Sequence, residues 1–299
     1  MRSNAVIRII VWSMVILILF GILSATIALR SANITSHHPQ NEKPQTTEAA
    51  FSKLPDESSL SFPADAIREI QIAWVAGNII VIPADVETIE VSESDVSDPK
   101  YALIWKQAGN KLEIFHSENH SFQIIGIHND DYISKDLCIR VPRDWACDSL
   151  EIDAASAALE VRNLTIRELD FDGADGTCDF IDCHIRNLDI DTASGDVTFT
   201  GKLDSLDFDA ASASFTGEFQ NTPDRLDMDS MDGKLDIALP EDCGYSLSMD
   251  GMSTTFQSEF NGTKNRNDAH IYGDGRCIIQ VDGMSCDVTI RKLTANLNP

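Results

Sequence analysis

The feature that most limits what this chain can fold into is a twelve-residue segment that recurs seven times in its second half. Positions 1 and 3 of each copy are apolar, whereas positions 2 and 4 are almost all polar. This strict alternation is typical of a strand with one buried face. The copies are LEIDAASAALEV (150–161), LDFDGADGTCDF (169–180), LDIDTASGDVTF (188–199), LDFDAASASFTG (206–217), LDMDSMDGKLDI (226–237), LSMDGMSTTFQS (247–258) and IQVDGMSCDVTI (279–290).

Successive copies begin 18 to 32 residues apart, and three of them place glycine at position 8, where it suits a tight bend between two strands. One such unit cannot bury its apolar face alone, whereas stacked units share a continuous core. The pattern predicts an all-β fold, with a repetitive parallel β-solenoid-like domain, or a closely related repetitive β sandwich, over residues 150–299.

Residues 61–149 form an N-terminal β region in which strand patterns continue with irregular spacing. A looser copy of the repeat lies at 70–81, and Ala108-Gly109-Asn110 has the composition of a hairpin turn. We expect this region to cap the solenoid, because an open end would expose unpaired strand edges.

A run of 21 residues without charge, at 9–29, predicts a single transmembrane helix, since it would span about 30 Å. Arg2 and Arg8 precede the run, so residues 1–8 would form a short cytoplasmic tail. The rest would then be extracytoplasmic at the cell membrane, with the lipid bilayer as partner of residues 9–29. A cleaved signal peptide is the alternative. Residues 31–60, polar and with three prolines, would form a flexible linker.

The chain is strongly acidic, with a formal net charge of −25, and residues 150–260 alone carry 25 acidic and 6 basic side chains. Nucleic acid and anionic lipid headgroups would be repelled, so no nucleic-acid partner is expected. Seven cysteines include no CxxC pair, which disfavours a zinc ribbon. They are interpreted as small buried residues, with disulfides as the alternative.

Position 4 of the repeat is aspartate in all seven copies, and position 2 is acidic in five. In a parallel stack these side chains would lie roughly 4.8 Å apart, where two charges repel by about 1 kcal/mol in water. Three interpretations stay open: a solvated and partly protonated face, carboxylates that accept hydrogen bonds from their own bends, or a Ca²⁺ ladder. The candidate metal ligands are Asp172, Asp191 and Asp209.

Catalytic motifs are lacking: the sequence contains no GxSxG, P-loop or HExxH. His116, His120 and His128 fall in a loop-like stretch and are expected to be exposed. The composition therefore favours a non-catalytic surface module that binds an unknown surface ligand or envelope protein. The alternative is an extracytoplasmic carbohydrate-active enzyme on a β-solenoid.

The segments IREIQIAWVAGNIIVIP, KLEIF, LCIRVPRDWACDSLEIDAASA and LDIDTASGDVTF resemble the bacterial putative-adhesin domain family of unknown function. The resemblance covers roughly residues 66–290 and is strongest at Ser194-Gly195-Asp196-Val197, whereas other copies replace this glycine. It implies a membrane-anchored β-repeat protein with an adhesin-like or envelope-associated role, and it transfers no catalytic residue.

Overall fold

The computed structural model describes residues 52–53, 59–94, 96, 98–117, 133–265 and 268–294. The predicted transmembrane helix at 9–29 and most of the predicted linker lie outside these ranges. Within them, no helix has both the length and the apolar character needed to cross a membrane. The chain divides into two compact units, Met1–Ala49 and Ala50–Pro299, and the second contains all the described residues.

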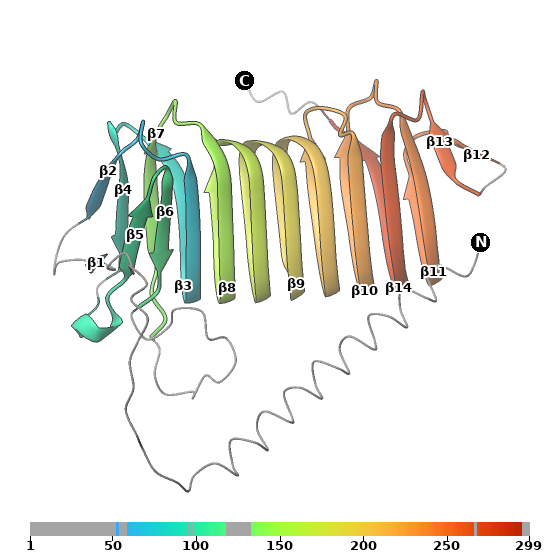
Figure 1. Cartoon of the computed structure of the whole chain (residues 1–299). Coiled ribbons are helices and arrows are strands. Elements are labelled where there is room, and N and C mark those ends of the chain that lie inside the picture. The colour runs from blue at the N-terminus through green and yellow to red at the C-terminus, as the bar shows by residue number, and fades with distance from the viewer. Residues whose placement is uncertain are drawn as a thin grey trace, which may run out of the picture. The chain divides into compact units, whose positions relative to one another are not determined.

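Parallel strands stacked side by side build most of the second unit (Figure 1). Each rung of the stack is one copy of the repeat, and β9 contains three rungs in one continuous strand. The prediction of an all-β, solenoid-like parallel repeat is confirmed. In spatial order the stack consists of β3 (Glu69–Ala84), β8 (Cys147–Arg162), β9 (Thr165–Phe219), β10 (Arg225–Leu239), β14 (Cys277–Lys292) and β11 (Tyr245–Ser258).

The last two copies exchange places, because β14 inserts between β10 and β11. Met228 of β10 pairs with Val281 of β14, and Val281 pairs in turn with Met249 of β11. The chain leaves β11 through the small strands β12 (Thr263–Lys264) and β13 (His270–Tyr272) before it returns. The long spacing before the last copy supplies the residues that this return requires.

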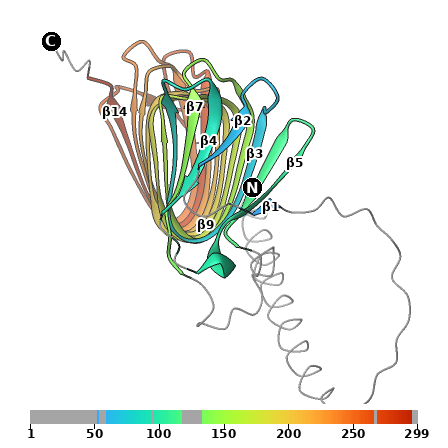
Figure 2. The ribbon, with the colours of Figure 1, turned by 90° about the vertical axis from the view of Figure 1, so that its left-hand side faces the viewer.

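Each rung folds back on itself into a U, so the stack forms a trough with two walls that meet at the bends (Figure 2). The bend lies within a continuous strand, in contrast to the predicted tight turn. At Gly233 an added Cβ atom would lie 2.8 Å from Ser230 Cβ, so a larger residue there would force a local shift. The apolar side chains of both walls fill the trough: Leu188 and Ile190 are buried, as is every other residue at positions 1 and 3 except the half-buried Met249.

Further strands extend both walls beyond β3, the first on each wall parallel to β3 and the outer ones antiparallel. On one wall β6 (Lys111–Phe115) pairs with β3, followed by β5 (Ile104–Ala108) and β1 (Ser52–Lys53). On the other, β7 (Leu137–Pro142) pairs with β3, followed by β4 (Thr88–Glu93) and β2 (Leu60–Pro63). A short 3-10 helix, Pro99–Tyr101, precedes β5. Gly109 forms the predicted hairpin turn between β5 and β6, with a φ of 63°.

A buried ion pair lies between these strands. The ammonium group of Lys135 donates hydrogen bonds to the carboxylate of Glu93 and, at 2.6 Å each, to the backbone oxygens of Tyr101 and His116. Burial lowers the pKa of Lys135, whereas Glu93 opposes that shift. These contacts satisfy the hydrogen-bonding capacity of a charge that would otherwise be costly to bury.

The expectation that His116 is exposed is wrong, since its side chain is 0% exposed. Its Nε2 atom lies 3.0 Å from the backbone oxygen of Ile133, and its ring packs edge-on against Trp74. Residues just after β6 thus continue into the interior instead of forming a surface loop. His120 and His128 lie outside the described residues.

All seven cysteines are unpaired thiols, and only Cys138 is partly exposed. Burial raises the pKa of Cys147, Cys178 and Cys277 to about 12. The interpretation of the cysteines as small buried core residues is confirmed, and at such pKa values these thiols are poor nucleophiles.

Candidate functional site: an acidic ladder on one wall

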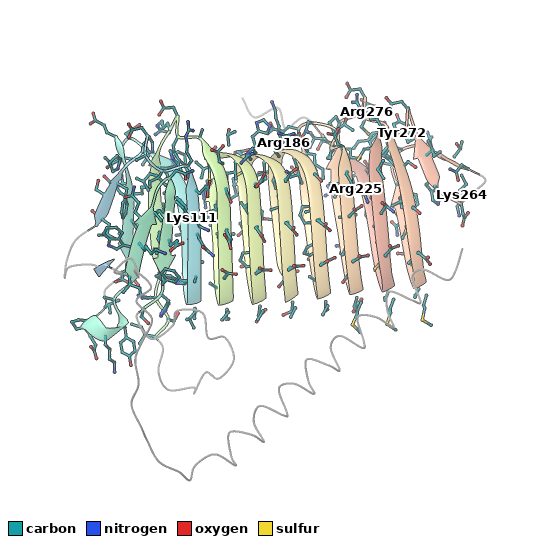
Figure 3. All side chains as sticks on the ribbon, in the orientation of Figure 1. Lys111, Arg186, Arg225, Lys264, Tyr272 and Arg276 are labelled. Carbon is teal, nitrogen blue, oxygen red and sulfur yellow. The ribbon has the colours of Figure 1, made fainter. Side chains whose placement is uncertain are left out.

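The acidic positions of the repeat form two continuous columns on the outer surface of one wall. Paired strands align the columns in register: Asp153 faces Asp172, and Asp209 faces Asp229. Figure 3 shows the resulting rows of oxygen-tipped side chains across the front wall. We call this set the acidic ladder. Its members are Glu151, Asp153, Asp170, Asp172, Asp189, Asp191, Asp207, Asp209, Asp227, Asp229, Asp250 and Asp282.

Partial burial and repulsion between carboxylates raise the pKa of five ladder carboxyls: Asp153, Asp170, Asp189, Asp191 and Asp209. Burial raises the pKa of Asp153 to about 6, with smaller contributions from nearby carboxylates. The pKa of Asp189 also rises to about 6, because of burial and then of Asp170 and Asp207. These directions are those expected when like charges share a surface at the strand spacing of roughly 4.8 Å.

The structure distinguishes among the three interpretations of the aspartate column. The raised pKa of Asp209, also about 6, arises from burial and neighbouring carboxylates. Burial and carboxylates likewise raise the pKa of Asp191. A hydrogen bond from the backbone would instead lower the pKa, so bend capping does not account for these two residues. A solvated, partly protonated face agrees with the shifts.

The candidate calcium ligands Asp172, Asp191 and Asp209 occupy one column on the three rungs of β9. Across the described parts of the chain, His, Cys, Asp and Glu side chains form no group of three or more that could hold a metal ion. Calcium binding by this column therefore stays a prediction.

Carboxylates at the bends and on the opposite wall are arranged differently, which the sequence reasoning missed. Four of these carboxylates each accept a hydrogen bond from a serine or threonine hydroxyl that lies in the same column on the neighbouring rung. This alternation of hydroxyl and carboxylate replaces repulsion with attraction. The signal was present in the aligned copies, at positions 7, 9 and 11. The pairs are Ser194 with Asp175 (3.0 Å), and Thr198 with Asp179, Ser214 with Asp196 and Thr255 with Asp287 (each 2.5 Å).

Cations neutralise the acidic ladder on either side of β9. Lys111 Nζ lies 3.3 Å from Glu151 Oε2, and Arg225 Nε lies 2.5 Å from Asp227 Oδ2. Figure 3 labels Lys111 beside β3 and Arg225 at β10. Between them, the described lysines and arginines form no ion pair with the ladder carboxylates of β9. We call these six carboxylates the central patch: Asp170, Asp172, Asp189, Asp191, Asp207 and Asp209.

Comparison with known proteins identifies one family match. The family model described as Toastrack DUF4097 matches residues 67–214 and, in an overlapping second match, residues 160–291. Together the two matches span the parallel stack from β3 to within β14. No curated protein sequence matches the chain.

Solved structures of low sequence identity also resemble the chain. One is a putative cell adhesion protein from Clostridium sporogenes, with 10% identity and a TM-score of 0.36, covering 80% of this chain and 100% of that one. Another is a putative adhesin from Bacteroides fragilis, with 11% identity, a TM-score of 0.41 and coverages of 79% and 98%. A putative lipid binding protein from Parabacteroides distasonis has 8% identity, a TM-score of 0.39 and the same coverages.

Proposed function

This chain belongs to the Toastrack DUF4097 family, and from that premise we propose that it is a non-catalytic surface-binding module. In this proposal residues 9–29 hold it in the cell membrane, and the β domain lies on the extracytoplasmic side. There it acts as an adhesin-like or envelope-associated accessory protein.

The observation that carries the proposal is the central patch. Three successive rungs present the same pair of carboxylates, and no ion pair from the described lysines and arginines neutralises them. A basic surface ligand or envelope protein would gain from this field without needing a unique pocket. Because each rung repeats the same pair, attachment would be multivalent, with modest affinity for each rung.

Binding can be tested with the full-length chain in detergent and a fluorescent oligolysine peptide as probe. In the ladder variant, Asp172, Asp191 and Asp209 are replaced by Asn. In the wall variant, Asp175, Asp179 and Asp196 are replaced by Asn, so the two proteins have the same net charge. If each lost contact contributes about 0.5 kcal/mol, the ladder variant should bind roughly tenfold more weakly.

The wall variant should bind the peptide nearly as well as the unmodified chain, because its three carboxylates lie outside the central patch and are already paired with hydroxyls. Equal weakening in both variants would show that only total charge matters, and the ladder would then not be the binding surface.

Membrane orientation is tested separately with protease added to spheroplasts. We expect digestion of the chain beyond residue 31, because Arg2 and Arg8 favour a cytoplasmic N-terminus. Complete protection would contradict the proposed orientation. Release of a soluble protein that begins near Leu29 would instead indicate a cleaved signal peptide.

A further inference from the structure

The stack ends at β11 with a strand edge that is mostly unpaired. Along its inner side, β11 pairs with β14 from Tyr245 to Ser258. On its outer side, within the described residues, it pairs only through Tyr245–Leu247, with β13. Residues 248–258 thus leave alternate backbone N–H and C=O groups of this edge without a strand partner. Such an edge is a ready template for another strand.

Side chains in β11 show that this end is only partly covered, by a ring contact of 4.5 Å between the centroids of Phe256 and His270 of β13. Met249 and Phe256 are half-buried, although their columns are fully buried in the other copies of the repeat. Met252, at the bend, is 85% exposed. The last rung therefore leaves apolar surface that a neighbouring strand could cover.

The opposite end of the domain is protected in ways that β11 is not. Its outermost strands are short: β1 has two residues, and β2 has four and ends in Pro63. Short edge strands and proline are standard devices against further pairing. Within residues 248–258 there is neither proline nor lysine.

Charge indicates what kind of strand the edge would accept. Strands β8 and β10 each carry four carboxylates, whereas β11 carries only Asp250 and no basic residue. Ser248 occupies a column that is acidic in five of the six other copies, and Gln257 occupies one that is acidic in three of them. A basic partner would be bound better if the carboxylates were retained. The absence of carboxylates on β11 reduces electrostatic repulsion only toward a partner that is itself acidic. A second copy of this chain is such a partner.

We propose that residues 248–258 of β11 pair with the same residues of a second copy, so that two stacks join into one continuous sheet. The pairing is antiparallel about a two-fold axis between Met252 and Ser253, since a closed symmetric dimer requires the same surface on both copies. This register pairs Met249 of one copy with Phe256 of the other, so that the inward-facing side chains of both stacks stay on one face of the sheet. It leaves the central patch accessible. The inference is independent of what that patch binds.

The test uses two serines that share a column on adjacent strands. Ser253 of β11 and Ser285 of β14 are directly paired, and both are exposed. Ser253→Asp and Ser253→Lys each place like charges beside one another at the proposed axis, which should weaken association by about tenfold. Ser285→Asp and Ser285→Lys introduce the same charges one strand inward and should leave association unchanged.

The mass of the full-length chain in detergent is measured by light scattering corrected for bound detergent, together with hydrogen exchange of the amides in 248–258. The expected result is a dimer with slow exchange at alternate amides of this segment, and faster exchange in both Ser253 variants only. A monomer at all concentrations would overturn the proposal, as would a dimer whose 248–258 amides exchange freely. If S253D and S253K changed association in opposite directions, residue 253 would face a fixed charge on the other copy and not residue 253 itself, and that result would also overturn the proposal.

Discussion

Replacing Asp189 by asparagine tests the electrostatic account of the acidic ladder. Asp189 is an exposed position-2 residue on the middle rung of β9, between the carboxylates of Asp170 and Asp207. Its neighbours in sequence, Leu188 and Ile190, are buried and unchanged by the substitution. Asparagine has nearly the same shape, so D189N removes one charge and little else.

The pKa of Asp189 indicates how strongly its charge opposes folding. The pKa rises from 3.8 to about 6, and one pKa unit corresponds to about 1.4 kcal/mol. For a fully buried carboxylate, this shift would lower the free energy of unfolding by about 3 kcal/mol. Because the side chain is exposed, solvent screening reduces this to about 1 kcal/mol. We expect D189N to increase the free energy of unfolding by that amount at neutral pH, and to raise Tm by about 2–4 °C.

The effect should depend on pH with a definite sign. The pKa of Asp189 is higher in the folded protein than in the unfolded chain. The folded protein therefore binds more protons than the unfolded chain between about pH 4 and 6. The destabilisation is therefore present above pH 6 and is relieved as the carboxyl becomes protonated. The advantage of D189N should shrink as pH falls through 6 and vanish near pH 4.

Urea unfolding of the full-length chain in detergent, followed by circular dichroism, measures both effects at about pH 7.5 and about pH 4.5. The control is Asp144→Asn, which removes one charge from the exposed turn between β7 and β8. If D189N were no more stabilising than D144N at pH 7.5, or kept its advantage in acid, repulsion within the ladder would not be the cause.

Three further changes test other parts of the structure. Leu188→Asp places a charge in the core and should cost more than about 4 kcal/mol, unfolding neighbouring rungs in the same urea assay, whereas Leu188→Met should cost less than about 1.5 kcal/mol. Glu93→Gln leaves the buried Lys135 without its anionic partner and should lower the free energy of unfolding by about 3 kcal/mol. Combining Glu93→Gln with Lys135→Met should recover most of this stability, and a double variant without recovery would contradict the ion-pair explanation. If Ca²⁺ bridges the rungs, millimolar Ca²⁺ should raise Tm more than NaCl of equal ionic strength, and the ladder variant should lose that difference; equal responses to both salts would leave only screening.

Local sequence periodicity determined the architecture of the rungs. The alternation Leu188-Asp189-Ile190 assigns one side chain outward and two inward whatever the neighbouring strand is, because successive side chains of a strand point to opposite faces. Repetition of that pattern at nearly constant spacing then places equivalent residues in columns. The acidic ladder follows from these two facts, and its residues could be named from the sequence alone.

The tertiary structure alone decided which strands are neighbours. The segments that form β11 and β14 have nearly the same pattern, so nothing local distinguishes consecutive stacking from the insertion of β14 beside β10. Likewise, Lys135 and Glu93 are 42 residues apart, and each looks like an ordinary surface charge until the strands around them close. Periodicity reports the face on which a side chain lies, whereas burial of His116 and exposure of the β11 edge depend on contacts between distant segments. Those contacts are set by the packing of the whole domain.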